Sequence, residues 1–220
     1  MRSLLLASLV LAAAPAFSEP HVRHAFASSA ARGAVQTALI DIPAGDITIR
    51  NGAPDRISVS GVALREPDGP RSREKQQRIV DDISAEVYVS SGEAVVRRRF
   101  GAEARGFSGE TFTKFVLIIE VPEGMNVDLL TRFGDVKIDG RFGNIDIDLR
   151  AGAIAVRTPR ADVRELHASC RLGNVVTNLG HEILERAGVF PRKINFKNPE
   201  GKSAVTVHTT AGDVNVTLTQ

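Results

Sequence analysis

Aspartate and asparagine side chains recur at short intervals in the second half of this chain, and such oxygen-bearing groups can bind calcium. Copies of one glycine-led phrase begin at Gly134, Gly143 and Gly152, nine residues apart. Calcium-binding β-rolls share this spacing, but their motif is Gly-Gly-x-Gly-x-Asp. Here a single glycine opens each copy, so the carbonyl-lined turn that would hold calcium is missing. We therefore interpret the carboxylates as solvated groups on an outer strand face, and we expect no metal or other cofactor.

Other residue types that could do chemistry lack the required spacing. His181-Glu182 is not followed by the second histidine of a His-Glu-x-x-His zinc site, and Gly106-Phe107-Ser108-Gly109 lacks the Gly-x-Ser-x-Gly spacing of a serine elbow. The sole cysteine, Cys170, lies in a stretch of alternating apolar residues, which predicts a buried side chain. A carboxylate pair of the glycosidase kind stays open, because such residues meet in space rather than in sequence. The single Tyr and the absence of Trp argue against it, since sugars usually stack on these rings.

Composition indicates an ordinary globular chain. Apolar residues make up 43% of the 220 positions and charged residues 25%. The net charge of +2 is small, which argues against nucleic acid as the partner.

The N-terminus resembles a Sec-type secretory signal. Arg2 precedes an apolar run from Leu4 to Ala14, which is shorter than the roughly 20 residues that a helix needs to cross a bilayer. We expect a signal peptide over 1–18, a flexible leader over 19–34 and one domain over 35–220. The protein is then exported, to the periplasm or beyond, and no later stretch predicts a transmembrane segment.

One phrase organises the rest of the chain: glycine, a small or polar residue, a branched aliphatic, any residue, and usually another aliphatic. A glycine turn followed by alternating aliphatic residues predicts a corner and a short strand. Repetition of this unit predicts stacked coils of roughly 18–21 residues, that is, an all-β, short-coil β-solenoid. The structural turn glycines of this pattern are Gly45, Gly134, Gly143, Gly152, Gly173 and Gly212.

Three segments depart from the repeat. Residues 71–83 place Ile79, Val80 and Ile83 on one face, which predicts a short surface helix. The run from Phe115 to Ile119 is continuously apolar and predicts a strand buried on both faces. Residues 182–187 suggest a single helical turn before an irregular excursion.

Several of these phrases together resemble the bacterial putative-adhesin β-solenoid domains, a family of unknown function, and the match covers roughly residues 35–218. The resemblance implies an exported or envelope-associated β-coil with no established catalytic residues. It is carried by Phe133-Gly134-Asp135-Val136-x-Ile138-x-Gly140, Gly212-Asp213-Val214-x-Val216, Ile119-Glu120-Val121-Pro122-Glu123-Gly124 and Ile40-x-Ile42-Pro43-Ala44-Gly45-Asp46-Ile47.

We therefore expect a non-catalytic, adhesin-like binding or scaffolding module whose partner is an envelope polysaccharide or protein. The alternatives are a β-helix carbohydrate-active enzyme and a structural protein of the envelope stress response. By face alternation alone, the surface contact wall is predicted to contain Lys137, Asp139, Asp146, Asp148 and Arg150.

Overall fold

The computed structural model describes residues 22–65, 73–101, 114–179, 185–187 and 192–220. The predicted signal segment and the Gly106–Gly109 phrase lie outside these residues. The described part is mostly β-structure with one α-helix, α1 (Arg73–Asp81), and a 3-10 turn at Arg160–Asp162. The all-β class and the single short helix are thus confirmed.

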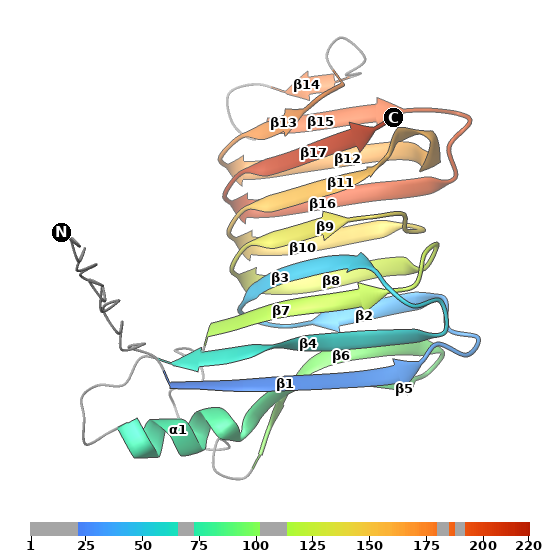
Figure 1. Ribbon diagram of the computed structural model, residues 1–220. Helices are drawn as coiled ribbons and strands as arrows, with labels where there is room; N and C mark the ends of the chain where they lie inside the picture. The colour runs from blue at the N-terminus through green and yellow to red at the C-terminus, as the bar shows by residue number, and fades with distance from the viewer. Residues whose placement is uncertain (1–21, 66–72, 102–113, 180–184, 188–191) are drawn as a thin grey trace, which may run out of the picture.

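The strands form two mixed sheets that face each other (Figure 1). Sheet A contains, in spatial order, β1 (Val22–Ala31), β4 (Arg56–Arg65), β7 (Lys114–Val121), β3 (Asp46–Asn51), β9 (Val136–Asp139), β11 (Ile154–Pro159), β17 (Val214–Thr219) and β13 (Val175–Thr177). Sheet B contains β14 (Glu185–Ala187), β15 (Arg192–Lys197), β12 (Val163–Leu172), β16 (Ser203–Ala211), β10 (Ile145–Ala151), β8 (Asn126–Phe133), β2 (Thr37–Asp41), β6 (Glu93–Phe100) and β5 (Ile83–Ser90).

The core lies between the two sheets and consists mainly of aliphatic side chains. Successive side chains of a strand point to opposite faces, so every second residue is buried. In β9, Val136 and Ile138 point inward while Lys137 is exposed. Strand β7 follows the same alternation: Val116 and Ile118 are 41% and 37% exposed. The prediction that this apolar run is buried on both faces was therefore wrong, because only one side of sheet A is covered.

Glycine corners carry the chain from sheet B to sheet A. Gly134 joins β8 to β9 and Gly152 joins β10 to β11, with φ angles of +116° and +142°. A Cβ atom on Gly152 would lie 2.0 Å from the carbonyl oxygen of Gly134, so only glycine fits such close stacking. The same contact links consecutive members of the whole column, which we call the glycine ladder: Gly45, Gly134, Gly152, Gly212 and Gly173.

Gly143 does not belong to the glycine ladder. It lies at the opposite corner, between β9 and β10, where the Asn126 side-chain oxygen accepts the backbone N–H of Asn144 at 2.8 Å. The nine-residue interval therefore alternates between the two corners. Strands β8 and β10 are consequently offset by 18 residues, as in the pairing of Val127 with Ile145, and so are β9 and β11.

The strand pairs do not stack in sequence order. Strands β16 and β17 come last in the chain, yet β16 lies between β10 and β12, and β17 lies between β11 and β13. The phrase repeat could not reveal this insertion, because every copy presents the same corner and the same alternating strand to either neighbour. The C-terminal strands are therefore interior members of both sheets.

Two predictions about the ends of the stack were also wrong. Most of the predicted flexible leader over 19–34 is strand β1, which pairs antiparallel with β4 and receives a hydrogen bond at its Arg23 carbonyl from Gln77 of α1. Its alanines and serines are small enough for a close-packed edge, although they show no apolar periodicity. At the other end, residues 185–187 form strand β14, paired with β15, rather than part of a helical turn.

Candidate functional site

The predicted contact wall is divided between the two sheets. Lys137 and Asp139 are on β9 and face outward from sheet A, whereas Asp146, Asp148 and Arg150 are on β10 and face outward from sheet B. The prediction of one wall was wrong because the corner at Gly143 moves the chain from one sheet to the other. The structure still brings three of the five residues together.

On sheet A the outward charges pair with one another. Arg157 Nη1 lies 3.9 Å from Asp139, and Arg50 Nη2 lies 2.7 Å from Glu120 Oε1. The Ser58 hydroxyl donates a second hydrogen bond to Glu120 at 3.0 Å. The Arg50 hydrogen bond, followed by the one from Ser58, lowers the pKa of Glu120 below its usual value. Among the described residues Lys137 forms no such pair, so the charges of this face are compensated only in part.

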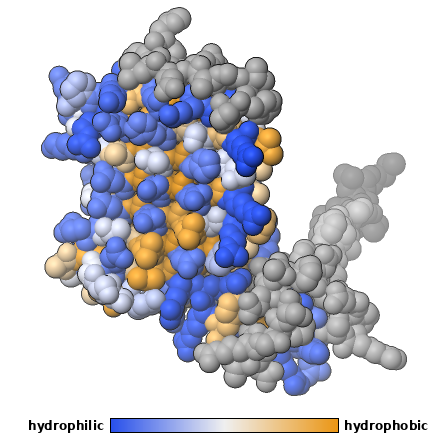
Figure 2. Space-filling view, turned by 180° about the vertical axis from the view of Figure 1, so that it is seen from behind, coloured by the Kyte–Doolittle hydropathy of each residue, from blue (hydrophilic) through white to orange (hydrophobic). Residues whose placement is uncertain are grey.

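The centre of sheet B is arranged differently. Asp146 on β10 is in register with Asp128 on β8, and Asp148 follows two positions along β10 on the same face. Partial desolvation, and then the nearby charges of Asp128 and Asp148, raise the pKa of Asp146. Figure 2 looks from behind onto this sheet and shows hydrophilic residues at regular intervals among hydrophobic ones. Three carboxylates thus share a surface without a cation between them.

Arg132 and Arg150 follow on the same outer face, close to the glycine corner. Over the residues that the structure describes, neither these arginines nor the three aspartates form an ion pair within 4.0 Å. The centre of sheet B therefore presents ordered charges of both signs without ion pairs, while most outward charges of sheet A are paired. The sequence could identify the outward positions but not their pairing, which depends on strand neighbours distant in the chain.

Sequence reasoning also missed a serine–histidine contact on this face. Ser169 Oγ of β12 lies 3.0 Å from His208 Nδ1 of β16, and Asp148 is in register with His208 on its other side. Within the described part of the chain, no hydrogen bond joins Asp148 to the histidine. A base that is not oriented by a third group, on an open face, does not form a working triad.

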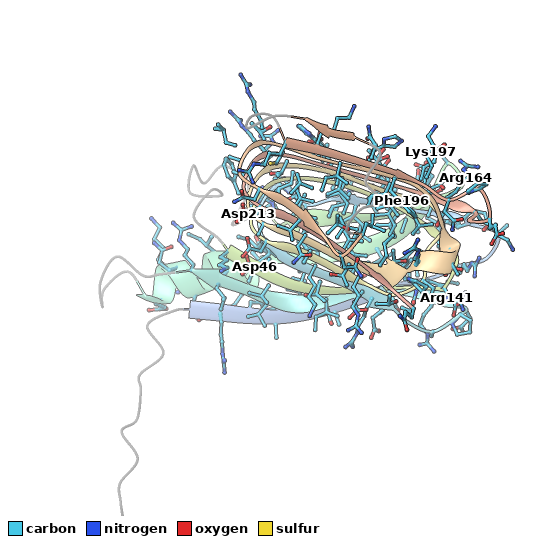
Figure 3. The ribbon with its side chains drawn as sticks, turned by 90° about the horizontal axis from the view of Figure 1, so that it is seen from above. Asp46, Arg141, Arg164, Phe196, Lys197 and Asp213 are labelled. Carbon is cyan, nitrogen blue, oxygen red and sulfur yellow. The ribbon has the colours of Figure 1, made fainter. Side chains whose placement is uncertain are left out.

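A hollow of about 380 Å³ lies at the corner opposite the glycine ladder. Arg141 spans it with a two-pronged contact to Asp162 at 2.9 and 3.0 Å, and Glu123 lies 3.5 Å from the same guanidinium group. The hydrogen bond from Arg141 lowers the pKa of Asp162. Figure 3 labels Arg141 at this corner, and Asp46 and Asp213 at the other. There the Asp213 carboxylate accepts the backbone N–H of Asn174 at 2.8 Å, so side-chain hydrogen bonds stabilise both corners.

A second hollow, of about 470 Å³, includes Arg160 and Phe196. The Arg160 guanidinium carbon lies 5.5 Å from the centre of the Phe196 ring, so the cation covers the ring. Figure 3 shows Phe196 near Arg164 and Lys197, on the sheet B side of the molecule.

The described residues contain no group of three or more His, Cys, Asp or Glu side chains placed to hold a metal ion. None of their helices has the length and apolar character to cross a membrane. The Cys170 thiol is buried, as predicted, and desolvation raises its pKa.

Comparison with known proteins identified the fold but no family. No family model matches the chain, and no curated protein matches it. Its structure is similar to that of a putative cell adhesion protein from Clostridium sporogenes, with a TM-score of 0.51 and 10% identity over 90% of this chain and 100% of that one. A putative adhesin from Bacteroides fragilis covers 89% of this chain, and 97% of its own length is matched, at 6% identity and a TM-score of 0.26. The first similarity shows a shared fold; the second is too low to support an argument.

Proposed function

We propose that this chain is a non-catalytic binding or scaffolding module of the bacterial envelope or extracellular space, and that it binds through the outer face of sheet B. One observation carries the proposal: among the described residues most outward charges of sheet A are paired, with Lys137 as an exception, whereas those at the centre of sheet B are ordered and form no ion pair. Exposed charges keep a protein soluble, and an ordered cluster of unpaired charges on one face is also a surface that a partner of complementary charge can bind. The fold shared with a protein described as a cell adhesion protein agrees with this role.

We further propose that each strand pair joined at the glycine ladder acts as one coil of a short solenoid. The 18-residue offset of β8 from β10 and of β9 from β11, together with the stacked corner glycines, supports this description. Such a stack holds outward side chains in straight rows at one strand spacing, about 4.8 Å. A rigid row suits a long, repetitive partner such as an envelope polysaccharide better than a small molecule.

Export is also a proposal, and it rests on the N-terminal sequence. Cell fractionation followed by N-terminal sequencing of the isolated protein tests it. We expect a mature chain that begins near Phe17 or Glu19. Recovery of the intact N-terminus from the cytoplasm would contradict the proposed export.

Binding through sheet B is tested with two variants of equal size. The first, D146N/D148N/R150Q, removes three outward charges from sheet B; the matched control, E120Q/D139N/R157Q, removes the same number of each sign from sheet A. Isolated envelope polysaccharides and purified envelope proteins are immobilised, and retention of each variant is measured. We expect the sheet B variant to bind with a changed affinity and the control to bind as the unaltered protein does. Equal retention of the two variants would remove this face from consideration.

One observation favours a carbohydrate-active enzyme as the second candidate: the raised pKa of Asp146 beside two other carboxylates. A glycosidase needs one protonated and one ionised carboxyl group on either side of the sugar bond. Asp162 in the corner hollow has a lowered pKa, which is the wrong direction for a general acid. Incubation with uronate and neutral polysaccharides, and assay of reducing ends and unsaturated products, separates the two functions. Product formation that D146N abolishes would establish the enzyme.

A further inference from the structure

Three arginines occupy the same position relative to the glycine ladder, two residues before a corner glycine. They belong to the phrases Arg132-Phe133-Gly134, Arg150-Ala151-Gly152 and Arg171-Leu172-Gly173. All three side chains are exposed on the outer face of sheet B, on strands β8, β10 and β12. We call Arg132, Arg150 and Arg171 the arginine row.

Strand register places the arginine row in a straight line. The pairs Leu149–Thr131 and Ala151–Phe133 flank Arg150, so Arg150 lies beside Arg132. On its other side Arg150 lies beside Thr210 of β16, and Thr210 in turn lies beside Arg171 of β12. Three strand spacings separate the first arginine from the last, a distance of about 14 Å. The inserted C-terminal strand therefore contributes a neutral hydroxyl within the row.

The arginine row is unfavourable for the fold itself. Like charges directly opposite each other on neighbouring strands are destabilising, and Arg132 and Arg150 are such a pair. In the part of the chain that the structure describes, no carboxylate compensates any of the three. The comparable row on sheet A alternates in sign across four strands, in the order Arg157, Asp139, Arg50 and Glu120. A row of alternating charges, which stabilises a sheet, therefore does occur elsewhere in this fold.

We propose that the arginine row binds a linear acidic polysaccharide, with its carboxylate groups on the guanidinium groups and its axis across the strands. This inference rests on the proposed function and names the partner of the same face. Planar guanidinium groups bind carboxylates with two parallel hydrogen bonds, which lysines cannot reproduce. One strand spacing separates Arg132 from Arg150, and two separate Arg150 from Arg171. These intervals match a polymer that presents an anionic group on every sugar or on alternate sugars.

The surroundings of the row favour a thin polymer over a membrane surface. Phe133 and Leu172, which follow two of the arginines, are 53% and 60% exposed and offer apolar surface to sugar ring faces. Asp148 lies on one side of the row, and the exposed Asp135 and Asp213 lie across the corner on the other. These carboxylates would repel an anionic chain from both sides and so confine it to the row. On a broad lipid surface these carboxylates would instead lie against phosphate groups, and the repulsion would disfavour binding.

The test compares the unaltered protein, the variant R132Q/R150Q/R171Q and a sheet A control, R50Q/K137Q/R157Q, which removes the same number of positive charges. Each is titrated with polygalacturonate, with uncharged dextran and with vesicles containing an anionic phospholipid. We expect polygalacturonate alone to bind the unaltered protein and the control, with an affinity that falls as salt is added. Loss of three exposed charge pairs predicts a roughly 3- to 100-fold weaker affinity in the arginine variant. Circular dichroism establishes that each variant is folded.

The outcomes separate this inference from the function on which it rests. Polygalacturonate binding that the arginine variant retains would overturn the role of the row. Binding to vesicles but not to polygalacturonate would replace the polysaccharide by a lipid surface and overturn the inference. Retention of envelope material through sheet B, with no binding of polygalacturonate, would leave the proposed function standing and refute the ligand class. A protein that binds none of these materials would contradict both.

Discussion

Gly152 lies in the middle of the glycine ladder, with Gly134 on one side and Gly212 on the other. The substitution G152A adds a methyl carbon 2.0 Å from the Gly134 carbonyl oxygen, at a φ of +142°. Strain in this backbone region costs about 1–3 kcal/mol for a residue other than glycine. Relief of the overlap requires separation of two backbone segments, and overpacking of this kind costs about 1–3 kcal/mol more. The sum, about 2–6 kcal/mol, is a large part of the 5–15 kcal/mol typical of a folded domain.

Thermal unfolding followed by circular dichroism measures this effect, and G124A is the matched control. Gly124 also has a positive φ, +78°, but an added Cβ meets nothing within 4 Å, so only backbone strain of about 1–2 kcal/mol remains. At about 2–4 °C per kcal/mol for a chain of this size, we expect Tm to fall by roughly 4–24 °C in G152A and by less than about 8 °C in G124A. Equal losses in the two variants would refute the close stacking of the corners.

Four further predictions concern titration and topology. Because the pKa of Asp146 is raised, its ionised form weakens folding above that pKa; D146N should raise Tm slightly at pH 7 and leave it unchanged in acid. Glu120 has a lowered pKa, so its contribution is present above its ordinary value of 4.5 and is lost as the pH falls through the folded value; E120Q should reduce the acid sensitivity of Tm. Deletion of 203–220 removes interior strands of both sheets, and we expect loss of the cooperative unfolding transition rather than a shortened stack. Cys170 is buried with a raised pKa, so a thiol reagent should label it only as the protein unfolds, and rapid labelling of the native protein would contradict its placement.

The sequence was informative where structure depends on neighbours along the chain. Alternation predicted which side chains of β9 and β10 face outward, and the glycine phrases predicted corners. It was uninformative where structure depends on which strands become neighbours. Both Gly134 and Gly143 open a phrase, yet they lie at opposite corners, and the insertion of β16 between β10 and β12 leaves no local mark.

In the candidate site, too, the orientation of side chains could be predicted but their neighbours on other strands could not. The outward orientation of Asp146, Asp148 and Arg150 could be predicted, but their separation from Lys137 and Asp139 could not. Ser169 and His208 are 39 positions apart, and only the inserted strand brings them into contact. The arginine row carries a local signal, an arginine two residues before a corner glycine. Its meaning depends on register, because the same phrase at Arg141-Phe142-Gly143 leads to the other corner and to an ion pair with Asp162.

The contrast between the two outer faces bears on how such a stack acquires a function. An outward position on either sheet accepts any polar side chain, since packing and hydrogen bonding involve the backbone and the inward residues. Charge order on these faces is therefore free to vary without loss of the fold. On sheet A it has the alternating order that minimises electrostatic energy, while on sheet B carboxylates cluster and arginines align. Because the fold does not set the charge order of either face, the difference between the two faces supports the proposal that sheet B is the one that meets a partner.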